Sequence, residues 1–308
     1  MSPLAGGGER CAVFRCFGGS CGIWITPTAD TDALEEALTR AKRLMQALHH
    51  RFTRFDSRSE LALLNDDPRP RVPISPMMAR LVRAVVQAAR MTDGLVDSTL
   101  LDQIEQAGYR RHHESSMPLE LSLSLAPERK PAFPNPIAHW KEIRLREDDR
   151  LIERPFGLKL DSGGIAKGLF ADILGQSFRS STRAYGVDLG GDLLIGASDG
   201  TPRLVRVQSP FDGGVLQEYE IRDAGVATSG IGRRSWLSAD GRPAHHLLDP
   251  STGRPAFTGI VQATALAPSA LEAEIRAKAA ILSGPERASG WLAHGGVLVY
   301  DDGSFTTV

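Results

Sequence analysis

The second half of the chain, from Trp140 onward, consists of short apolar runs separated by turn signals. These runs have the length and composition of β-strands, and most are joined by spacers of hairpin length rather than by regular helices. Parallel strands need a crossover of a dozen or more residues, so runs this close together favour antiparallel pairing. The sequence therefore predicts an α+β fold with a mainly antiparallel sheet and packed helices. The runs include residues 143–145, 151–152, 158–160, 204–207 and 261–266.

Helices are predicted where apolar residues recur every three or four positions. The first such stretch follows a strand-like run at residues 22–26, with Asp30 to Asp32 as candidate caps. The second begins at Ser75, with proline at the first helical position, and ends at a Thr-Asp-Gly stop. The predicted helices cover residues 34–48, 76–91, about 164–178 and 269–282.

We expect residues 1–308 to form a single domain, because the chain shows no internal repeat and no clear linker. One segment interrupts the regular pattern. Residues 111–139 are rich in serine and proline, with a brief leucine alternation from Leu119 to Leu125. This composition predicts a long loop excursion, with an edge strand as the alternative.

The charge balance excludes one class of partner. With 36 basic and 37 acidic side chains the formal charge is −1, so the chain has no overall field to attract nucleic acid.

No apolar stretch is long enough for a transmembrane segment, and none near the first residue resembles a signal peptide or lipobox, so we expect a cytoplasmic protein. Three cysteines spaced by five residues are interpreted as reduced structural thiols.

Chemistry is suggested first by the sequence LDSGGIAKG at residues 160–168, which places an acid, a glycine pair and a lysine where a strand meets a helix. Glycines let a ligand approach the backbone, and a helix start with a nearby lysine suits an anion such as phosphate. A tight turn with an exposed lysine explains the same residues and is the commoner outcome for an isolated glycine-rich turn.

Three further segments remain open when they are taken singly. The glycine pair at residues 190–191 predicts a hairpin turn. His246 lies three residues before Asp249, which suits a general base at a strand end, although a packed histidine beside a turn fits equally well. Phe55 could stack on a flat ring or pack in the core.

The order and spacing of six motifs closely resemble the ApbE family, the FAD:protein FMN transferases. The resemblance covers nearly the whole chain. The first motif comprises FD at residues 55–56, SEL at 59–61 and Asn65. The others are TDGLVDST at 92–99, LDSGGIAKG at 160–168, LGGD at 189–192, VATSG at 226–230 and HLLDPSTGRP at 246–255.

This resemblance implies an enzyme that transfers FMN from FAD to a threonine or serine hydroxyl of an acceptor flavoprotein, with release of AMP. It implies FAD bound in a central cleft and a magnesium ion. His246 would be the base for the acceptor hydroxyl. The implied FAD contacts are Phe17, Phe55, Leu95, Val96, Asp97, Asp161, Lys167 and Leu248.

The chain departs from the family pattern on the last predicted helix. The commoner motif A-D-x-x-x-T reads here Ala273-Glu274-Ile275-Arg276-Ala277-Lys278. A protonated lysine cannot ligate a cation. Either the carbonyl of Gly164 and the carboxylate of Glu274 hold magnesium with more water, or Lys278 supplies part of the positive charge; the retained carboxylate favours the first.

Two other functions are compatible with the same residues. Water in place of the acceptor hydroxyl would make the chain a pyrophosphatase that cleaves FAD to FMN and AMP. Loss of chemistry through the altered metal positions would leave a non-catalytic FAD-binding protein, against which the presence of His246 argues.

Overall fold

The computed structural model describes residues 8–27, 32–111, 116–146 and 150–308. Within them, eight strands form a central sheet, and each neighbouring pair is antiparallel. The predicted α+β fold with a mainly antiparallel sheet is confirmed. The strands run in the order β1 (Arg10–Cys16), β2 (Gly19–Pro27), β6 (Thr182–Leu189), β7 (Asp192–Ala197), β10 (Ala224–Gly230), β15 (Ile260–Ala267), β16 (Gly296–Tyr300) and β17 (Phe305–Thr307).

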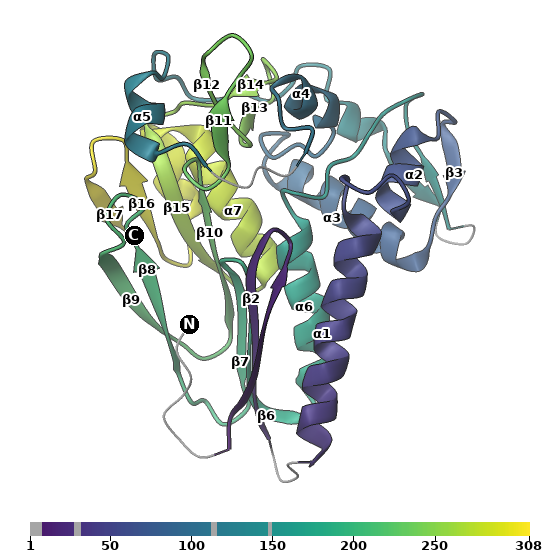
Figure 1. Ribbon diagram of the computed structural model, residues 1–308, viewed down its shortest axis with the longest axis vertical. Coiled ribbons are helices and arrows are strands. Elements are labelled where there is room, and N and C mark those ends of the chain that lie inside the picture. Colours follow the sequence, from purple (N-terminus) through teal and green to yellow (C-terminus); the bar gives the residue numbers. More distant parts are fainter. Residues whose placement is uncertain (1–7, 28–31, 112–115, 147–149) are drawn as a thin grey trace.

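Long helices cover one face of this sheet (Figure 1). The four helices are those predicted, apart from their exact ends: α1 (Asp32–Phe52), α3 (Pro76–Met91), α6 (Ala166–Phe178) and α7 (Ala270–Ser283). Helix α1 packs on β1 and β2, α6 on β6 and β7, and α7 on β10 and β15. Helix α3 contacts both α6 and α7, so α7 is buried on nearly every side.

The helix starts follow from capping side chains. Ser75 and Ser269 each accept a hydrogen bond from a backbone N–H in the first turn of the helix that follows, α3 and α7 respectively. The caps expected at residues 30–31 for α1 lie outside the described residues. Helix α1 continues to Phe52, which is buried against Phe170 of α6.

A hairpin covers part of the opposite face of the sheet. It consists of β8 (Arg203–Gln208) and β9 (Val215–Ile221), with alternating buried and exposed residues along β8. Its buried side chains Val205 and Ile221 form an apolar cluster with Leu193, Ile195 and Val226 of the sheet. This part of the sheet is therefore enclosed between helices and a hairpin, as a two-sided core requires.

The remaining elements are short and gather at the upper end of the molecule in Figure 1, where they surround the ends of α6 and α7. They comprise a three-stranded sheet, two small hairpins and several one- or two-turn helices: β3 (Arg71–Pro73), β5 (Leu151–Glu153), β4 (Arg144–Arg146), β11 (Ser235–Leu237), β12 (Pro243–His245), β13 (Leu248–Asp249), β14 (Arg254–Pro255), α2 (Glu60–Asp66), α4 (Leu101–Gln106), α5 (Leu119–Ser124), α8 (Pro285–Ala288), η1 (His139–Glu142) and η2 (Ser289–Trp291).

Two local predictions are wrong. The leucine alternation in residues 111–139 forms helix α5 rather than a loop or edge strand, with Leu119 and Ser122 buried on one face at helical spacing. The apolar run at residues 158–160 joins no strand ladder; the side chain of Asn65 takes the place of a partner strand, because it bonds both backbone groups of Leu160.

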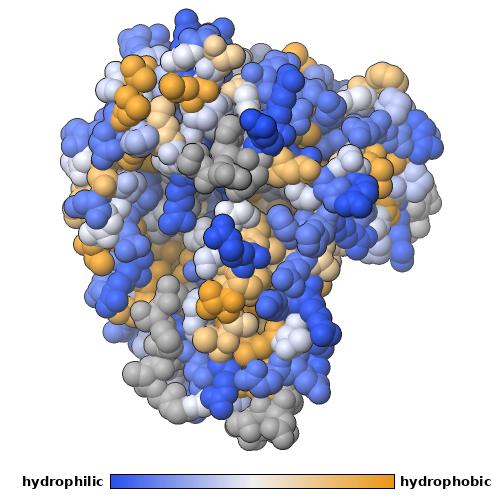
Figure 2. Space-filling model, in the orientation of Figure 1, coloured by the Kyte–Doolittle hydropathy of each residue, from blue (hydrophilic) through white to orange (hydrophobic). Residues whose placement is uncertain are grey.

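The surface is mixed in character. In Figure 2, apolar surface appears over the part of the molecule where β1 and β2 lie in Figure 1, and Val13 of β1 is 63% exposed.

Cys11 is exposed and Cys16 and Cys21 are buried, all three as free thiols. Burial raises the pKa of Cys16 to about 11 and that of Cys21 to about 12, so both stay protonated. Among the described helices, none combines the length and the hydropathy needed to span a bilayer.

A glycine determines how closely α7 approaches the sheet. A Cβ on Gly225 of β10 would lie 2.3 Å from the backbone carbonyl of Ser269, the residue that caps α7. We expect Gly225→Ala to lower the free energy of unfolding by about 2–3 kcal/mol, because backbone has to shift. Gly19→Ala is the matched control, since a Cβ there meets nothing within 4 Å. Urea denaturation of both variants measures this, and equal stabilities would contradict the packing described.

Candidate active site

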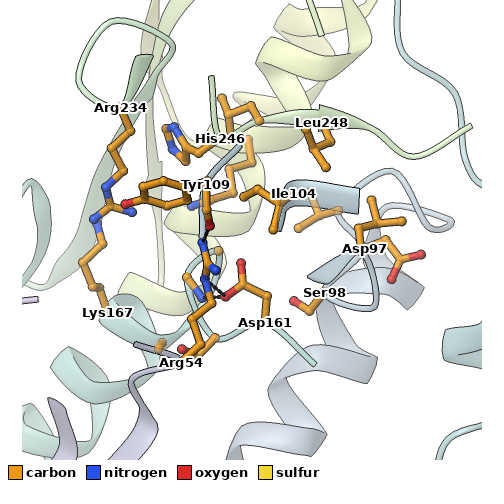
Figure 3. Close-up of a pocket in the computed structure, with 18 of the residues that line it drawn as sticks. Arg54, Asp97, Ser98, Ile104, Tyr109, Asp161, Lys167, Arg234, His246 and Leu248 are labelled. Carbon is orange, nitrogen blue, oxygen red and sulfur yellow. Dashed lines mark hydrogen bonds and ion pairs between the residues drawn. The ribbon is translucent and has the colours of Figure 1, made fainter. Parts of the chain in front are cut away.

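A cavity of about 390 Å³ opens where the short elements meet the ends of α6 and α7 (Figure 3). Its volume lies within the range of small-molecule sites. Its wall is apolar on one side and charged on the other. In Figure 3, Lys167 and Arg234 extend toward each other from opposite walls, while Asp97 lies at the far side of the cavity.

The glycine loop before α6 forms the floor of this cavity and is held from three directions. The Asn65 side chain accepts from the N–H of Leu160 and donates to its carbonyl, both at 2.8 Å. Ser162 Oγ donates to the carbonyl of Phe52 at 2.8 Å, and the N–H of Asp161 donates to the carbonyl of Ser98 at 2.8 Å. The loop is thus preorganised to present its backbone to a ligand.

Two lysines are paired with two carboxylates beside the loop. Lys167 of α6 is bonded to Asp192, at the start of β7, and Lys278 of α7 lies 2.9 Å from Oε1 of Glu274. The other carboxylate oxygen of Glu274 accepts from the N–H of Gly168 at 2.8 Å. The structure therefore places two ammonium groups and two carboxylates in one buried cluster.

The pKa values of the two acids move in opposite directions. Burial, followed by the charge of Glu274, raises the pKa of Asp192 to about 6 despite its pair with Lys167. Burial alone would also raise the pKa of Glu274, but the charges of Lys278 and Lys167 and its two hydrogen bonds lower it. Glu274 is therefore the carboxylate that stays ionised most firmly.

His246 lies between β12 and β13, on the cavity wall opposite the glycine loop (Figure 3). Burial and the positive charge of Arg234 lower its pKa well below 6.5, and the ammonium groups of Lys278 and Lys167 act in the same direction. Its Nδ1 atom is enclosed and has no hydrogen-bond partner among the described residues. The imidazole is thus neutral at pH 7 and able to accept a proton.

The neighbours of His246 have structural roles. His245 points into the core, where its ring packs edge-on against that of Phe257 with the ring centroids 4.7 Å apart. Burial lowers the pKa of His245 to about 3. Asp249, three residues beyond His246, accepts hydrogen bonds from Ser251 and from the backbone N–H of Phe133. It therefore orders the turn before β14, and the described contacts give it no bond to His246.

An arginine and two aromatic rings form another wall, with a third ring stacked behind them. The guanidinium of Arg54 lies 4.4 Å from the ring centroid of Phe55 and 4.8 Å from that of Tyr109, and its Nε is 3.7 Å from Asp161 Oδ1. Tyr109 stacks on Trp236 with centroids 5.2 Å apart. Phe55 is 44% exposed, so it is available for contact with a flat ligand.

Asp97 provides an acceptor at the far side of the cavity. Its Oδ1 accepts from the backbone N–H and the hydroxyl of Thr99, at 2.8 and 2.7 Å. Its Oδ2 is buried and has no partner in the described part of the chain, and burial raises its pKa above the ordinary value. An N–H donor of a ligand would satisfy this oxygen.

The structure brings most of the predicted site residues to this one cavity. Glu274 is the exception, because it lies behind Lys278 and is fully buried. Sequence reasoning did not single out Arg54, Tyr109, Arg234 or His49, which also line the cavity. The predicted residues on the cavity wall are Phe17, Phe55, Leu95, Val96, Asp97, Asp161, Gly164, Lys167, His246 and Leu248.

The family assignment follows from a comparison with known protein families. A sequence model described as the ApbE family matches residues 18–300. The chain belongs to the ApbE family. This match includes all the cavity residues predicted from the resemblance except Phe17, which directly precedes it.

Relatives named FAD:protein FMN transferase align with most of the chain. The FAD:protein FMN transferase of Escherichia coli K12 is 28% identical over 233 residues, which cover 74% of this chain and 65% of that protein. The Vibrio cholerae O395 protein of the same name is 25% identical over 276 residues, 84% of this chain and 76% of its own. The chain thus aligns with slightly less than two thirds of the E. coli relative.

The fold is that of ApbE proteins. The crystal structure of the Thermotoga maritima ApbE protein matches with a TM-score of 0.76 at 24% identity, over 97% of this chain and 96% of that one. The apo flavinyl transferase ApbE of Pseudomonas stutzeri matches with a TM-score of 0.76 at 21% identity, over 97% and 94%.

The residues expected to hold magnesium do not fit that role in this chain. Both oxygens of Glu274 are engaged, one by the Lys278 ammonium and one by a backbone N–H. The Lys278 side chain lies against Gly164, where an added Cβ would be 3.6 Å from Lys278 Cε. Across the described residues, three or more His, Cys, Asp or Glu side chains do not gather around any point that could hold a metal ion.

Proposed function

We propose that the chain transfers FMN from FAD to a threonine or serine hydroxyl of an acceptor flavoprotein. The hydroxyl oxygen forms a bond to the phosphorus of the FMN half, the P–O bond to the AMP half breaks, and AMP leaves with the bonding electrons. The products are a phosphoester-linked flavin and AMP. One observation carries this proposal: a histidine held neutral faces the ammonium groups of Lys167 and Lys278 across one cavity.

The cavity has an apolar part and a charged part, as FAD has a flat ring system and a charged diphosphate. The isoalloxazine ring would lie among Leu95, Val96, Phe17 and Phe55, whose apolar and aromatic surfaces suit a flat ring. Asp97 Oδ2 would accept from an N–H of the ring system. The diphosphate would lie over the glycine loop near Lys167, where backbone N–H groups and ammonium charge favour an anion.

His246 would take the proton of the acceptor hydroxyl. Its neutral imidazole is a base at pH 7. Its Nδ1 atom makes no hydrogen bond within the described residues, so none has to break before it accepts a proton. The acceptor chain must enter from the open side of the cavity, which brings its hydroxyl between His246 and the diphosphate. Lys167 and the loop would stabilise the charge that develops on the transferring phosphoryl group.

Chromatography of the nucleotides tests the proposal against its two alternatives. The chain is incubated with FAD, with and without a candidate acceptor flavoprotein domain. Transfer predicts AMP only when the acceptor is present, without free FMN. Free FMN and AMP in equal amounts without acceptor would instead establish a pyrophosphatase, and intact FAD throughout would establish a binding protein.

The cytoplasmic location expected from the sequence is part of this proposal, because it would place acceptor and FAD in the same compartment. Cell fractionation with an antibody against the chain tests it. Recovery with the membrane or the extracytoplasmic fraction would contradict it.

A further inference from the structure

A lysine stands where the family resemblance places a metal ligand. Lys278 lies on α7, its side chain is 8% exposed, and it reaches the cavity wall beside Gly164. Its position is fixed by close helix packing, since a Cβ on Gly168 of α6 would lie 2.6 Å from the carbonyl of Ala270 in α7. This close approach brings the side chain of Lys278 to the glycine loop before α6.

We infer that the Lys278 ammonium takes the place of a divalent cation beside the FAD diphosphate, so that this chain binds and uses metal-free FAD. The inference rests on the proposed function and identifies the form of its substrate. A lysine ammonium has three donors. One N–H is directed to Glu274 Oε1. The other two would donate to a backbone carbonyl of the glycine loop and to a phosphate oxygen.

The charges of the cluster support this substitution. Lys167 and Lys278 balance Asp192 and Glu274, so the buried cluster is neutral when all four side chains are ionised. Magnesium binds oxygen at about 2.0–2.1 Å with nearly ideal octahedral geometry. A dication on Glu274 would therefore lie within a few ångström of the ammonium already bonded there, and like charges repel strongly when buried.

The diphosphate would meet positive charge without a metal. Lys167, Lys278 and Arg234 all line the same cavity, and Figure 3 shows Lys167 and Arg234 extending toward each other. Glu274 acts as a positioning residue, because its carboxylate ties Lys278 to the N–H of Gly168 at the start of α6. The carboxylate that binds a cation in the commoner motif would here orient a cationic side chain.

The test compares FAD binding to the unmodified chain in EDTA and in magnesium, by isothermal titration. We expect dissociation constants that agree within about threefold. In parallel, electron paramagnetic resonance of added Mn²⁺ should show no ion bound to the FAD complex. A loss of affinity of about tenfold or more in EDTA, or stoichiometric Mn²⁺ binding, would overturn the inference. Absence of FAD binding under both conditions would overturn the proposed function as well.

Two variants complete the experiment. Lys278→Met should weaken FAD in EDTA by about 10- to 100-fold, the effect of one charge-assisted hydrogen bond, while riboflavin affinity is kept. The double variant Glu274→Asp/Lys278→Thr restores the commoner motif and should make FAD binding magnesium-dependent. Circular dichroism verifies that both fold. Unchanged FAD affinity in Lys278→Met would contradict the inference. The comparison of EDTA and magnesium uses the unmodified chain, so it tests the inference even if neither variant folds.

Discussion

His246→Ala is expected to lower the rate of FMN transfer by about 100- to 10,000-fold, the contribution of a positioned general base. FAD affinity should change by less than about threefold, because the FAD-binding groups proposed here are other residues. The cause lies in the environment of the imidazole. Burial, Arg234 and the nearby lysines lower its pKa well below 6.5, so the side chain is present as the base form.

The pH dependence gives a second readout for the same residue. A histidine with an ordinary pKa loses its base form as the pH falls through about 6.5. His246 has a lowered pKa, so its base form persists below that point and the rate at saturating FAD should stay level between about pH 8 and pH 6.5. His294→Ala, at an exposed histidine away from the cavity, is the matched control. Normal transfer by His246→Ala would remove this residue from the mechanism.

The second large effect concerns affinity for the phosphates. Lys167→Met should raise the dissociation constant of FAD by about 10- to 100-fold, because a charge-assisted hydrogen bond to phosphate is lost. Riboflavin has no phosphate, so its affinity should change by less than about threefold. Titration of both ligands into the same variant measures the difference.

The partner of Lys167 has to be considered in this experiment. Asp192 is 1% exposed and would be left without its counter-ion, which for a buried pair costs about 3–5 kcal/mol of stability. The double variant Lys167→Met/Asp192→Asn removes both charges and should recover stability without recovering FAD affinity. Equal losses for FAD and riboflavin in this double variant would show that Lys167 acts on the fold and not on the phosphates.

The long elements of the fold were predictable from periodicity. Apolar spacing located α1, α3, α6 and α7, and hairpin-length turns predicted the antiparallel sheet, because these patterns reflect burial of one face over many residues. Short elements lack that signal. Helix α5 contains three alternating leucines, with Leu125 at its C-cap, and would be assigned as a strand by pattern alone, yet it buries Leu119 and Ser122 at helical spacing.

The site was predictable only where its residues occur in motifs. Resemblance located His246, Lys167 and Gly164, which the structure brings to one cavity. Arg54 and Arg234 lie 180 residues apart and carry no recognisable spacing, so their shared place on the cavity wall depends on tertiary packing. The pairing of side chains was equally inaccessible, because nothing in one sequence specifies that Lys278 bonds Glu274.

The proposed activity moves FMN to a hydroxyl of another protein. Intact and fragment mass spectrometry of the acceptor domain, after incubation with FAD and the chain, detects that product. We expect an acceptor heavier by one FMN less one water, with the added mass on one threonine or serine and none on the variant carrying valine or alanine there. An acceptor of unchanged mass, in the presence of consumed FAD, would contradict it.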